Sequence, residues 1–411
     1  MYKKKRGQVT VYIILGIIIL FLAILLFYFR DTTEKEMSMQ EIVRAQKIPK
    51  EARPITNYVT TQLDDATKKG LLLIGMQGGY IYESQGGPIP DPIDEGKDFI
   101  YDYNDYAVSY GIYRQTQESS YYYFPDPPRY PWDNFPCIFY EDCVGARIML
   151  DLGSFGTKNL PPLNGSNPSN PSIESQLTLY ITNYLKENID LTIFDEQGFD
   201  ITYGEMNVSI IIGEDDVIAF LEYPLIINKT LTNKITKVSY FYTNPQIRLK
   251  KVYKFVEKII KNDIVDITFD IDNPNNDEDD IWIEKVEDAY KQDDLVVDLI
   301  VIRDNRSMLY AEPYTFQFAR ENRNPALHLI YLPILPKGNV QDYITKEDIN
   351  PKAYDADEDV LTFTYDPNLP YPVANLGPDS RFYLRVTVDD GVLEDWQDLV
   401  ILVIGFISQY I

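Results

Sequence analysis

Acidic side chains are the residues of this sequence with the greatest chemical potential. The chain has 63 aspartates and glutamates, with a dense run at residues 270–280 and a further group near the C-terminus. Carboxylate oxygens are the ligands that Ca²⁺ prefers, and a pair of carboxylates is what a surface glycosidase would use. The run 270–280 lacks the glycine and the final glutamate of an EF-hand, so a solvated loop between strands is favoured. No spacing singles out a catalytic pair, because acids this abundant form chance pairs.

Histidine and cysteine, which often serve in catalysis or bind metals, are nearly absent. His328 is the only histidine, which excludes sites with several histidines and makes any Ser-His-Asp arrangement depend on this one residue. The two cysteines are Cys137 and Cys143. We expect them to form a disulfide in an exported region, holding a local loop and not the fold; two free thiols are the alternative.

An uninterrupted apolar run at residues 9–29 determines where the chain lies. Its length matches a bilayer-spanning helix of about 20 residues. Residues 3–6, Lys-Lys-Lys-Arg, precede the run, and the chain becomes acidic after Arg30. The positive-inside rule therefore predicts a single-pass cell-membrane protein with a cytoplasmic N-terminus and residues 31–411 outside the cell.

The junction before the apolar run carries a second signal. Gly7 and Gln8 place a small and a polar residue directly before the apolar core, whereas a secretory signal has its cleavage site after that core. The junction resembles the class III, prepilin-like signals of archaeal surface proteins. That resemblance implies cleavage between Gly7 and Gln8 with the helix retained. The chain departs from pilins because Tyr12 and Ile13 stand where a glutamate is usual; an uncleaved signal anchor is the alternative.

Composition indicates packed domains with an acidic surface. The apolar fraction is 45% and the net charge is −25; since residues 1–30 contribute +5, the exported part carries −30. Such a charge repels phosphate backbones, which argues against nucleic acid as a partner. The 33 tyrosines and 26 prolines suggest many short strands joined by turns. Tyrosine stripes at residues 101–123 can stack on sugars, although strand and loop packing is the favoured interpretation.

The pattern of elements predicts an α+β, multi-domain chain with an N-terminal transmembrane helix. We expect an amphipathic helix at 54–69 that stops at Gly70, followed by a hairpin of strands at 71–74 and 80–82. Further helices are expected from Ser172 and after Asn244-Pro245, with a hairpin around Gly213 between them. The remaining expected strands are 264–271, 281–283 and 295–303. The expected units are 1–30 (basic end and membrane helix), 31–70 (stalk and helix), 71–170 (Tyr/Pro-rich β region), 171–262 (α+β), 263–322 (β-rich connection) and 323–411 (β-sandwich).

The last unit carries the most specific motif outside the membrane run. Residues 350–365 and 381–403 resemble Ig-like surface domains of the PKD and cadherin-like type, through the patterns A-x-D-x-D-x-D-x-L and V-x-D-x-G. The resemblance implies a C-terminal Ig-like β-sandwich in which two acidic turns can lie at one end. There they could share a Ca²⁺ ion or serve as ordinary polar turns. The candidate ligands are Asp355, Asp357, Asp359, Asp389 and Asp390.

Anchor and acidic β-rich units together predict a non-catalytic surface protein for adhesion or envelope architecture, in contact with membrane lipid and with other surface proteins or glycans. A pilin-like filament subunit is the alternative, and a surface hydrolase using paired carboxylates is a third hypothesis. The anchor and ectodomain order also resemble uncharacterised archaeal surface proteins, which implies location and no activity. N-glycosylation acceptors of the N-x-[ST] type occur at Asn164, Asn207, Asn228 and Asn305.

Overall fold

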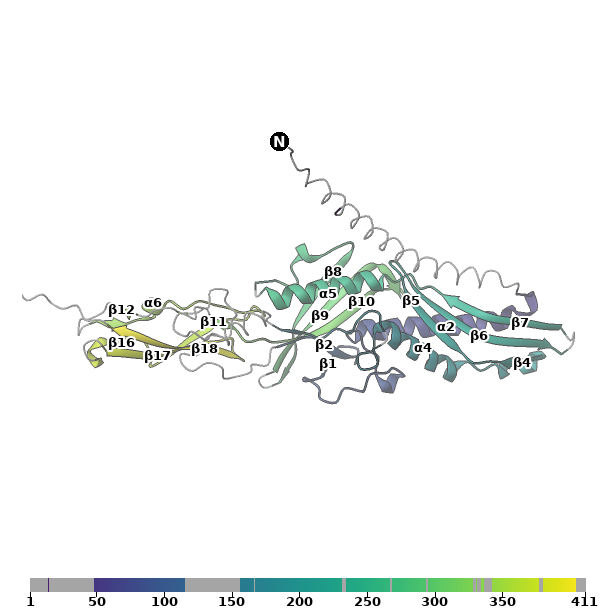
Figure 1. Cartoon of the computed structure of the whole chain (residues 1–411), viewed down its shortest axis with the longest axis horizontal. Helices are drawn as coiled ribbons and strands as arrows, with labels where there is room; N and C mark the ends of the chain where they lie inside the picture. The colour runs from purple at the N-terminus through teal and green to yellow at the C-terminus, as the bar shows by residue number, and fades with distance from the viewer. Residues whose placement is uncertain are drawn as a thin grey trace, which may run out of the picture.

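The computed structural model shows an elongated, mixed α+β molecule (Figure 1). The structure describes residues 14, 48–114, 156–165, 167–230, 234–266, 268–292, 295–327, 330, 334–335, 342–376 and 380–403. Along its length, a sheet near helix α4 (Ile173–Asn188), a central sheet and a C-terminal β unit follow one another. Short 3₁₀ turns connect the elements: η1 (Lys50–Ala52), η2 (Glu83–Gln85), η3 (Thr192–Gln197), η4 (Pro274–Asn276) and η5 (Val373–Asn375).

Helix α2 (Arg53–Met76) is longer than the predicted helix, because Gly70 does not end it. A Cβ atom at Gly70 would lie 2.9 Å from Leu177 Cδ2, so this glycine lets α4 (Ile173–Asn188) approach closely. Gly75 has the same role against β10 (Glu312–Glu321), where an added Cβ would lie 2.1 Å from the Thr315 carbonyl oxygen. The predicted strand at 71–74 is therefore wrong, and so is its hairpin with 80–82; these glycines mark close packing.

Helix α4 and the sheet beside it follow the sequence pattern. Ser172 caps α4 as predicted, its hydroxyl accepting from the Ser175 amide at 3.2 Å. The predicted hairpin is formed by β5 (Asn207–Ile212) and β6 (Val217–Lys229). The far end of β6 pairs with β4 (Phe199–Tyr203), and β6 also pairs along its length with β7 (Lys234–Thr243), a strand that the sequence patterns did not indicate.

The central sheet has the order β1-β2-β10-β9-β8, with β3 beside β2. Its strands are β1 (Phe99–Tyr101), β2 (Ala107–Tyr113), β3 (Thr157–Lys158), β8 (Ile281–Gln292), β9 (Leu295–Leu309) and β10. One face shares the main core with helix α5 (Leu249–Val265), through Ile300, Ile302, Phe316 and Phe318. The strand predicted at 264–271 is wrong, because α5 runs on to Val265 and a turn follows it.

The C-terminal unit has its own apolar core. Its main sheet has the order β12-β18-β17-β15, and two small sheets pair β11 with β14 and β13 with β16. Leu361, Phe363 and Tyr365 pack against its core, as the motif predicted. The elements are β11 (Ala326–Leu327), β12 (Ile334–Leu335), β13 (Tyr343–Ile344), α6 (Lys346–Ile349), β14 (Ala353–Tyr354), β15 (Thr362–Asp366), β16 (Tyr371–Pro372), β17 (Ser380–Asp389) and β18 (Glu394–Val403).

Several sequence predictions concern residues outside the described ranges. The junction of Gly7 and Gln8, both cysteines and His328 lie outside the described residues, and of the apolar run at 9–29 only Ile14 lies within them. Within the described part of the chain, no helix has both the length and the apolar character needed to cross a membrane.

Candidate functional site

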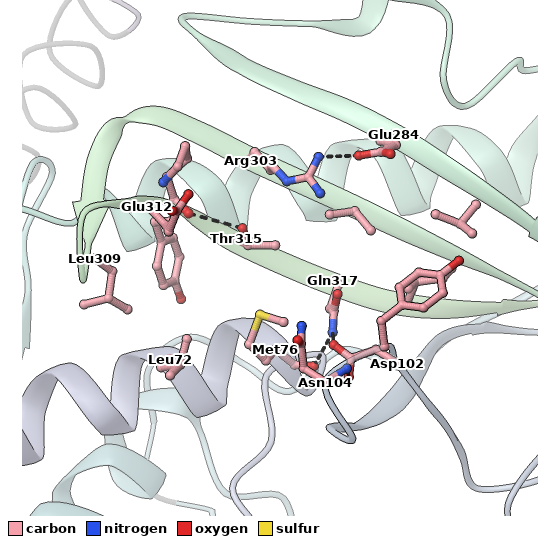
Figure 2. A pocket seen from close by; sticks show the side chains of 16 residues that line it. Leu72, Met76, Asp102, Asn104, Glu284, Arg303, Leu309, Glu312, Thr315 and Gln317 are labelled. Atoms are coloured by element: carbon pink, nitrogen blue, oxygen red, sulfur yellow. Dashed lines mark hydrogen bonds and ion pairs between the residues drawn. The ribbon is translucent and has the colours of Figure 1, made fainter. Parts of the chain in front are cut away.

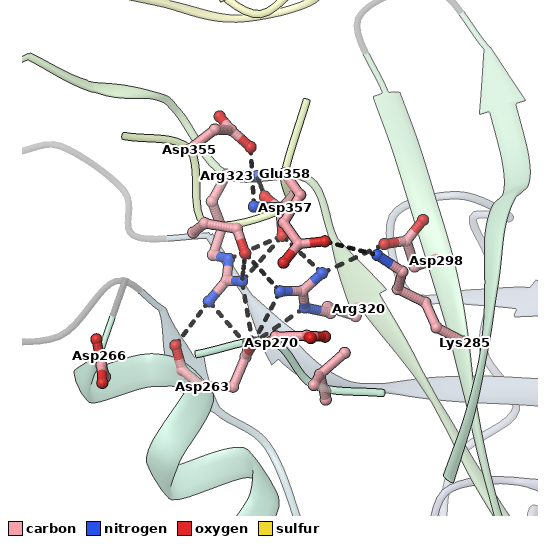
Figure 3. Close-up of polar contacts among 12 residues, drawn as sticks. Asp263, Asp266, Asp270, Lys285, Asp298, Arg320, Arg323, Asp355, Asp357 and Glu358 are labelled. Atoms are coloured by element: carbon pink, nitrogen blue, oxygen red, sulfur yellow. Dashed lines mark hydrogen bonds and ion pairs between the residues drawn. The ribbon is translucent and has the colours of Figure 1, made fainter. Parts of the chain in front are cut away.

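Two of the cavities in the described structure are lined partly by polar side chains. A cavity of about 350 Å³ lies between α2 and the strands β8 to β10 (Figure 2). It contains none of the predicted metal-binding, disulfide, cleavage or glycosylation residues, but Tyr103 of the tyrosine stripe lies at its rim. The predicted acidic turn around Asp357 lies instead where the C-terminal unit meets α5 and the end of β10 (Figure 3).

Asp357, predicted as a calcium ligand, is paired with two arginines. Its Oδ1 lies 2.9 Å from Arg323 Nη2 and 2.9 Å from Arg320 Nη1, and its Oδ2 accepts from the Arg323 amide at 2.6 Å. The side chain is only 5% exposed. Burial opposes its ionisation, but the charges of Arg323 and Arg320 outweigh this and lower the pKa of Asp357.

The same two arginines also bind Asp263, in the last turn of α5. Arg320 Nη2 lies 2.8 Å from Asp263 Oδ1, and Arg323 Nη1 lies 2.9 Å from Asp263 Oδ2. Both guanidinium groups also donate to the Ala356 carbonyl oxygen, at 2.7 and 3.0 Å. We name Asp263, Arg320, Arg323 and Asp357 the junction network. Its two buried arginines and two buried aspartates balance in charge. Because Asp263 belongs to α5, Arg320 to β10 and Asp357 to the C-terminal unit, the network links these three parts of the fold.

Asp355 and Asp359 lie on the same turn as Asp357 but have different surroundings. Asp355 Oδ1 accepts from the amides of Asp357 and Asp359, at 2.8 and 3.1 Å, while its buried Oδ2 has no partner among the described residues. Burial and the charge of Asp357 raise the pKa of Asp355 to about 7. Burial and the neighbouring charges of Asp357 and Asp390 raise the pKa of Asp359 to about 6.

Asp389 and Asp390 shape the turn between β17 and β18. Asp389 Oδ1 accepts from the Gly391 amide at 2.7 Å, and Asp390 Oδ1 accepts from the Val392 amide at 2.7 Å. Gly391 has a φ of 99°, which favours glycine. Asp390 also reaches the other side of the junction, because its Oδ2 accepts from Asn322 Nδ2 at 3.4 Å. Both aspartates thus hold the turn in place through hydrogen bonds, and their predicted role as calcium ligands stays a prediction.

The two acidic turns lie close together, since the charge of Asp390 is among those that raise the pKa of Asp359. Asp357 and Asp359 line a cavity of about 150 Å³ together with Asp298 and Asn322. Asn322 is buried, and its Oδ1 has no partner among the described residues. Within the described ranges, however, no group of three His, Cys, Asp or Glu side chains is arranged to hold a metal ion. Calcium binding here stays a prediction, and Asp357 could join it only in competition with its arginines.

The arginines were missed because no local pattern distinguishes them from surface residues. Arg320 is the last residue but one of β10 and Arg323 follows in a polar segment, where long basic side chains are normally solvated. Asp263 lies in a helix turn that the sequence places before a strand. The only signal was the position of both arginines at the predicted boundary near residue 323.

Asp355 makes the stability of the junction depend on pH. Its carboxyl pKa rises from 3.8 to about 7 on folding, so its contribution is complete below pH 3.8 and is lost as pH rises toward 7. Asp355→Asn keeps an oxygen for the turn amides but cannot ionise. Between pH 5 and pH 8 we expect wild-type unfolding free energy to fall by about 1–3 kcal/mol more than that of the variant. Melting curves at both pH values measure this, and equal slopes for the two proteins would contradict it.

The four predicted glycosylation asparagines differ in accessibility. Asn164, Asn207 and Asn305 are exposed. Asn228 lies within β6 between β4 and β7, is half-buried, and has a buried Oδ1 without a partner among the described residues. We therefore expect glycans, if attached to the folded protein, at the three exposed positions.

The buried charges of this site form ion pairs and turn contacts that join two parts of the fold. Comparisons of the chain with family models, with curated proteins and with solved structures found no match.

Proposed function

We propose that the chain is a non-catalytic, single-pass membrane protein whose ectodomain is displayed on the cell surface for adhesion or envelope architecture. The observation that carries this proposal is the charge-free apolar run at residues 9–29, behind the basic residues 3–6 and before an acidic ectodomain. Membrane lipid is its first partner. Other surface proteins or glycans are the others, because the acidic charge disfavours nucleic acid.

The arrangement of the described units supports this role. The β4–β7 sheet and the C-terminal sheet lie at opposite ends of the long axis (Figure 1). An elongated ectodomain can present its far end to a partner, provided that its units do not pivot. The junction network supplies such a restraint, since Arg320 and Arg323 contact α5 on one side and the turn at Asp357 on the other.

In this proposal the C-terminal unit is an Ig-like domain of the PKD or cadherin-like type. The antiparallel β17–β18 hairpin, the parallel pairing of β12 with β18 and the separate apolar core all suit such a domain. Ca²⁺ is its proposed ligand, at the acidic turns with Asp359 and Asp390 as the groups less committed to arginine. A rise in melting temperature on adding millimolar Ca²⁺ after EDTA would support this assignment.

A pilin-like filament subunit is the second candidate, favoured by the junction at Gly7 and Gln8. Cleavage there would leave Gln8 as the first residue with the apolar helix intact. Mass spectrometry of the mature N-terminus, with sedimentation of detergent-free extracts for filaments, separates the candidates. A mature chain beginning at Gln8 without filaments fits a processed surface anchor, whereas filaments would favour the pilin-like subunit.

The adhesion role is tested by placing the full chain in liposomes. Proteoliposomes with the ectodomain outward are expected to bind envelopes isolated from the producing cells, whereas protein-free liposomes of the same lipid do not. Purified protein added in excess should compete. Equal retention of both liposome types would contradict adhesion.

A further inference from the structure

The cavity between α2 and the central sheet has the shape of a small-molecule site (Figure 2). Its volume of about 350 Å³ lies at the lower end of the range for ligand pockets, ~300–1,000 Å³. Leu299 and Val301 of β9 form part of an apolar floor. Both residues belong to one apolar cluster with Ile100 of β1 and Tyr110 of β2. The floor of the cavity is therefore continuous with this apolar cluster.

The charged groups around the cavity are largely matched. Arg303 is ion-paired with Glu284, and its guanidinium lies 4.8 Å from the centre of the Trp282 ring. Asp102 accepts from Gln317 Nε2 at 2.7 Å and from the Asn104 amide at 2.9 Å. A further carboxylate, Glu312, lies at the rim and is exposed.

The hydrogen-bond donors and acceptors that line the cavity indicate which kind of ligand would fit it. The exposed carboxylate of Glu312 offers hydrogen-bond acceptors, whereas Arg303, the basic residue among the described lining, is engaged with Glu284. A fitting ligand must therefore bring hydrogen-bond donors, carry no negative charge, and cover an apolar floor.

Two tyrosines complete the cavity. Tyr103 lies at its rim and is 85% exposed, the highest value among the described tyrosines, so its ring is free to stack on a ligand. Tyr314 is buried, and its hydroxyl has no hydrogen-bond partner among the described residues. Buried polar groups are nearly always paired, so a ligand hydroxyl would give Tyr314 the partner that it lacks.

We propose that this cavity binds an uncharged sugar unit. A pyranose ring has an apolar C–H face that can pack on Tyr103 and hydroxyl groups that can donate to the acceptors of the rim. Acidic sugars are disfavoured by the carboxylates. The inference rests on the proposed function for the source of the ligand, a glycan of the envelope; a free sugar offers the same chemistry.

Saturation-transfer NMR on the full chain, in a detergent without a sugar headgroup, tests the site. The probes are the methyl glycosides of glucose, galactose, mannose and N-acetylglucosamine, with N-acetylneuraminic acid as the acidic comparison. At least one neutral glycoside is expected to bind, and Tyr103→Ala to weaken its Kd roughly tenfold. The matched control is Tyr203→Ala, an exposed tyrosine on β4 outside the cavity, which should leave Kd unchanged.

Tyr314→Phe separates a binding role from a structural one. Removal of the hydroxyl is expected to weaken glycoside binding roughly two- to tenfold, while the sugar-free protein melts at the same temperature or higher. A lower melting temperature with unchanged affinity would assign the hydroxyl to the fold and count against the proposal.

The proposal is overturned if no neutral glycoside binds, or if Tyr103→Ala and Tyr203→Ala bind equally well. Competition in the proteoliposome assay distinguishes the sources. Inhibition of envelope binding by the methyl glycoside identifies an envelope glycan, whereas glycoside binding without envelope binding supports a free sugar and contradicts adhesion. Envelope binding by a chain that binds no glycoside overturns the sugar site and leaves the proposed function standing.

Discussion

Asp357→Ala is expected to lower the free energy of unfolding by about 3–5 kcal/mol, the usual cost of removing one partner from a buried ion pair. The substitution leaves Arg320 and Arg323, which are 2% and 3% exposed, with Asp263 as their shared buried carboxylate partner, together with the partly buried Asp298 beside Arg320. Urea unfolding of the full chain, followed by tryptophan fluorescence, measures the loss. Trp282 on β8 and Trp396 on β18 report on the two sides of the junction.

The matched control is Asp398→Ala on β18. Asp398 forms a two-pronged pair with Arg385, at 2.7 and 2.9 Å, but that arginine is 47% exposed. Exposed pairs contribute about 0–1 kcal/mol. Similar losses for the two variants would show that the junction network does not stabilise the fold beyond an ordinary surface pair.

Gly75→Ala is expected to destabilise the protein by about 1–3 kcal/mol, although helix propensity alone favours alanine over glycine by about 0.5–1 kcal/mol. The substitution is nevertheless expected to destabilise the protein, because the new Cβ would lie 2.1 Å from a backbone oxygen of β10. A rigid strand cannot move aside as a side chain can. Thermal melting of the two proteins measures the difference.

Two other substitutions in α2 serve as controls for Gly75→Ala. Gly70→Ala meets the side-chain atoms of Leu177 and Tyr180 at 2.9 and 3.0 Å, which can shift, so its cost should be smaller. Thr61→Ala, at an exposed position, should be neutral or slightly stabilising. A Gly75→Ala protein as stable as wild type would show that α2 does not pack on β10 as described.

Local patterns predicted the elements whose ends are fixed by local chemistry. The hydroxyl of Ser172 begins α4, Gly213 lies in the turn between β5 and β6, and Gly391 lies in the turn between β17 and β18. In each case the deciding hydrogen bond or dihedral angle belongs to residues within a few positions of one another. Patterns of this local kind can be recognised in a single sequence.

The sequence predictions failed where contacts between residues far apart in the chain determine the structure. Gly70 reads as a helix stop until Leu177, more than a hundred residues later, is known to pack on it. The pairing of β10 with β2 brings together Ala319 and Tyr110, which no local pattern could join. The junction network likewise depends on Asp263 and Asp357 meeting across two units, so the acidic motif was found but its arginine partners were not.

The surface location of the ectodomain is the central claim, and protease treatment of intact producing cells tests it most directly. Protease added outside is expected to remove epitopes placed after Lys158 and within the C-terminal unit, while an epitope at the N-terminus stays protected until the membrane is dissolved. Full-length protein surviving on intact cells, yet degraded once detergent is added, would place the ectodomain inside and contradict the account.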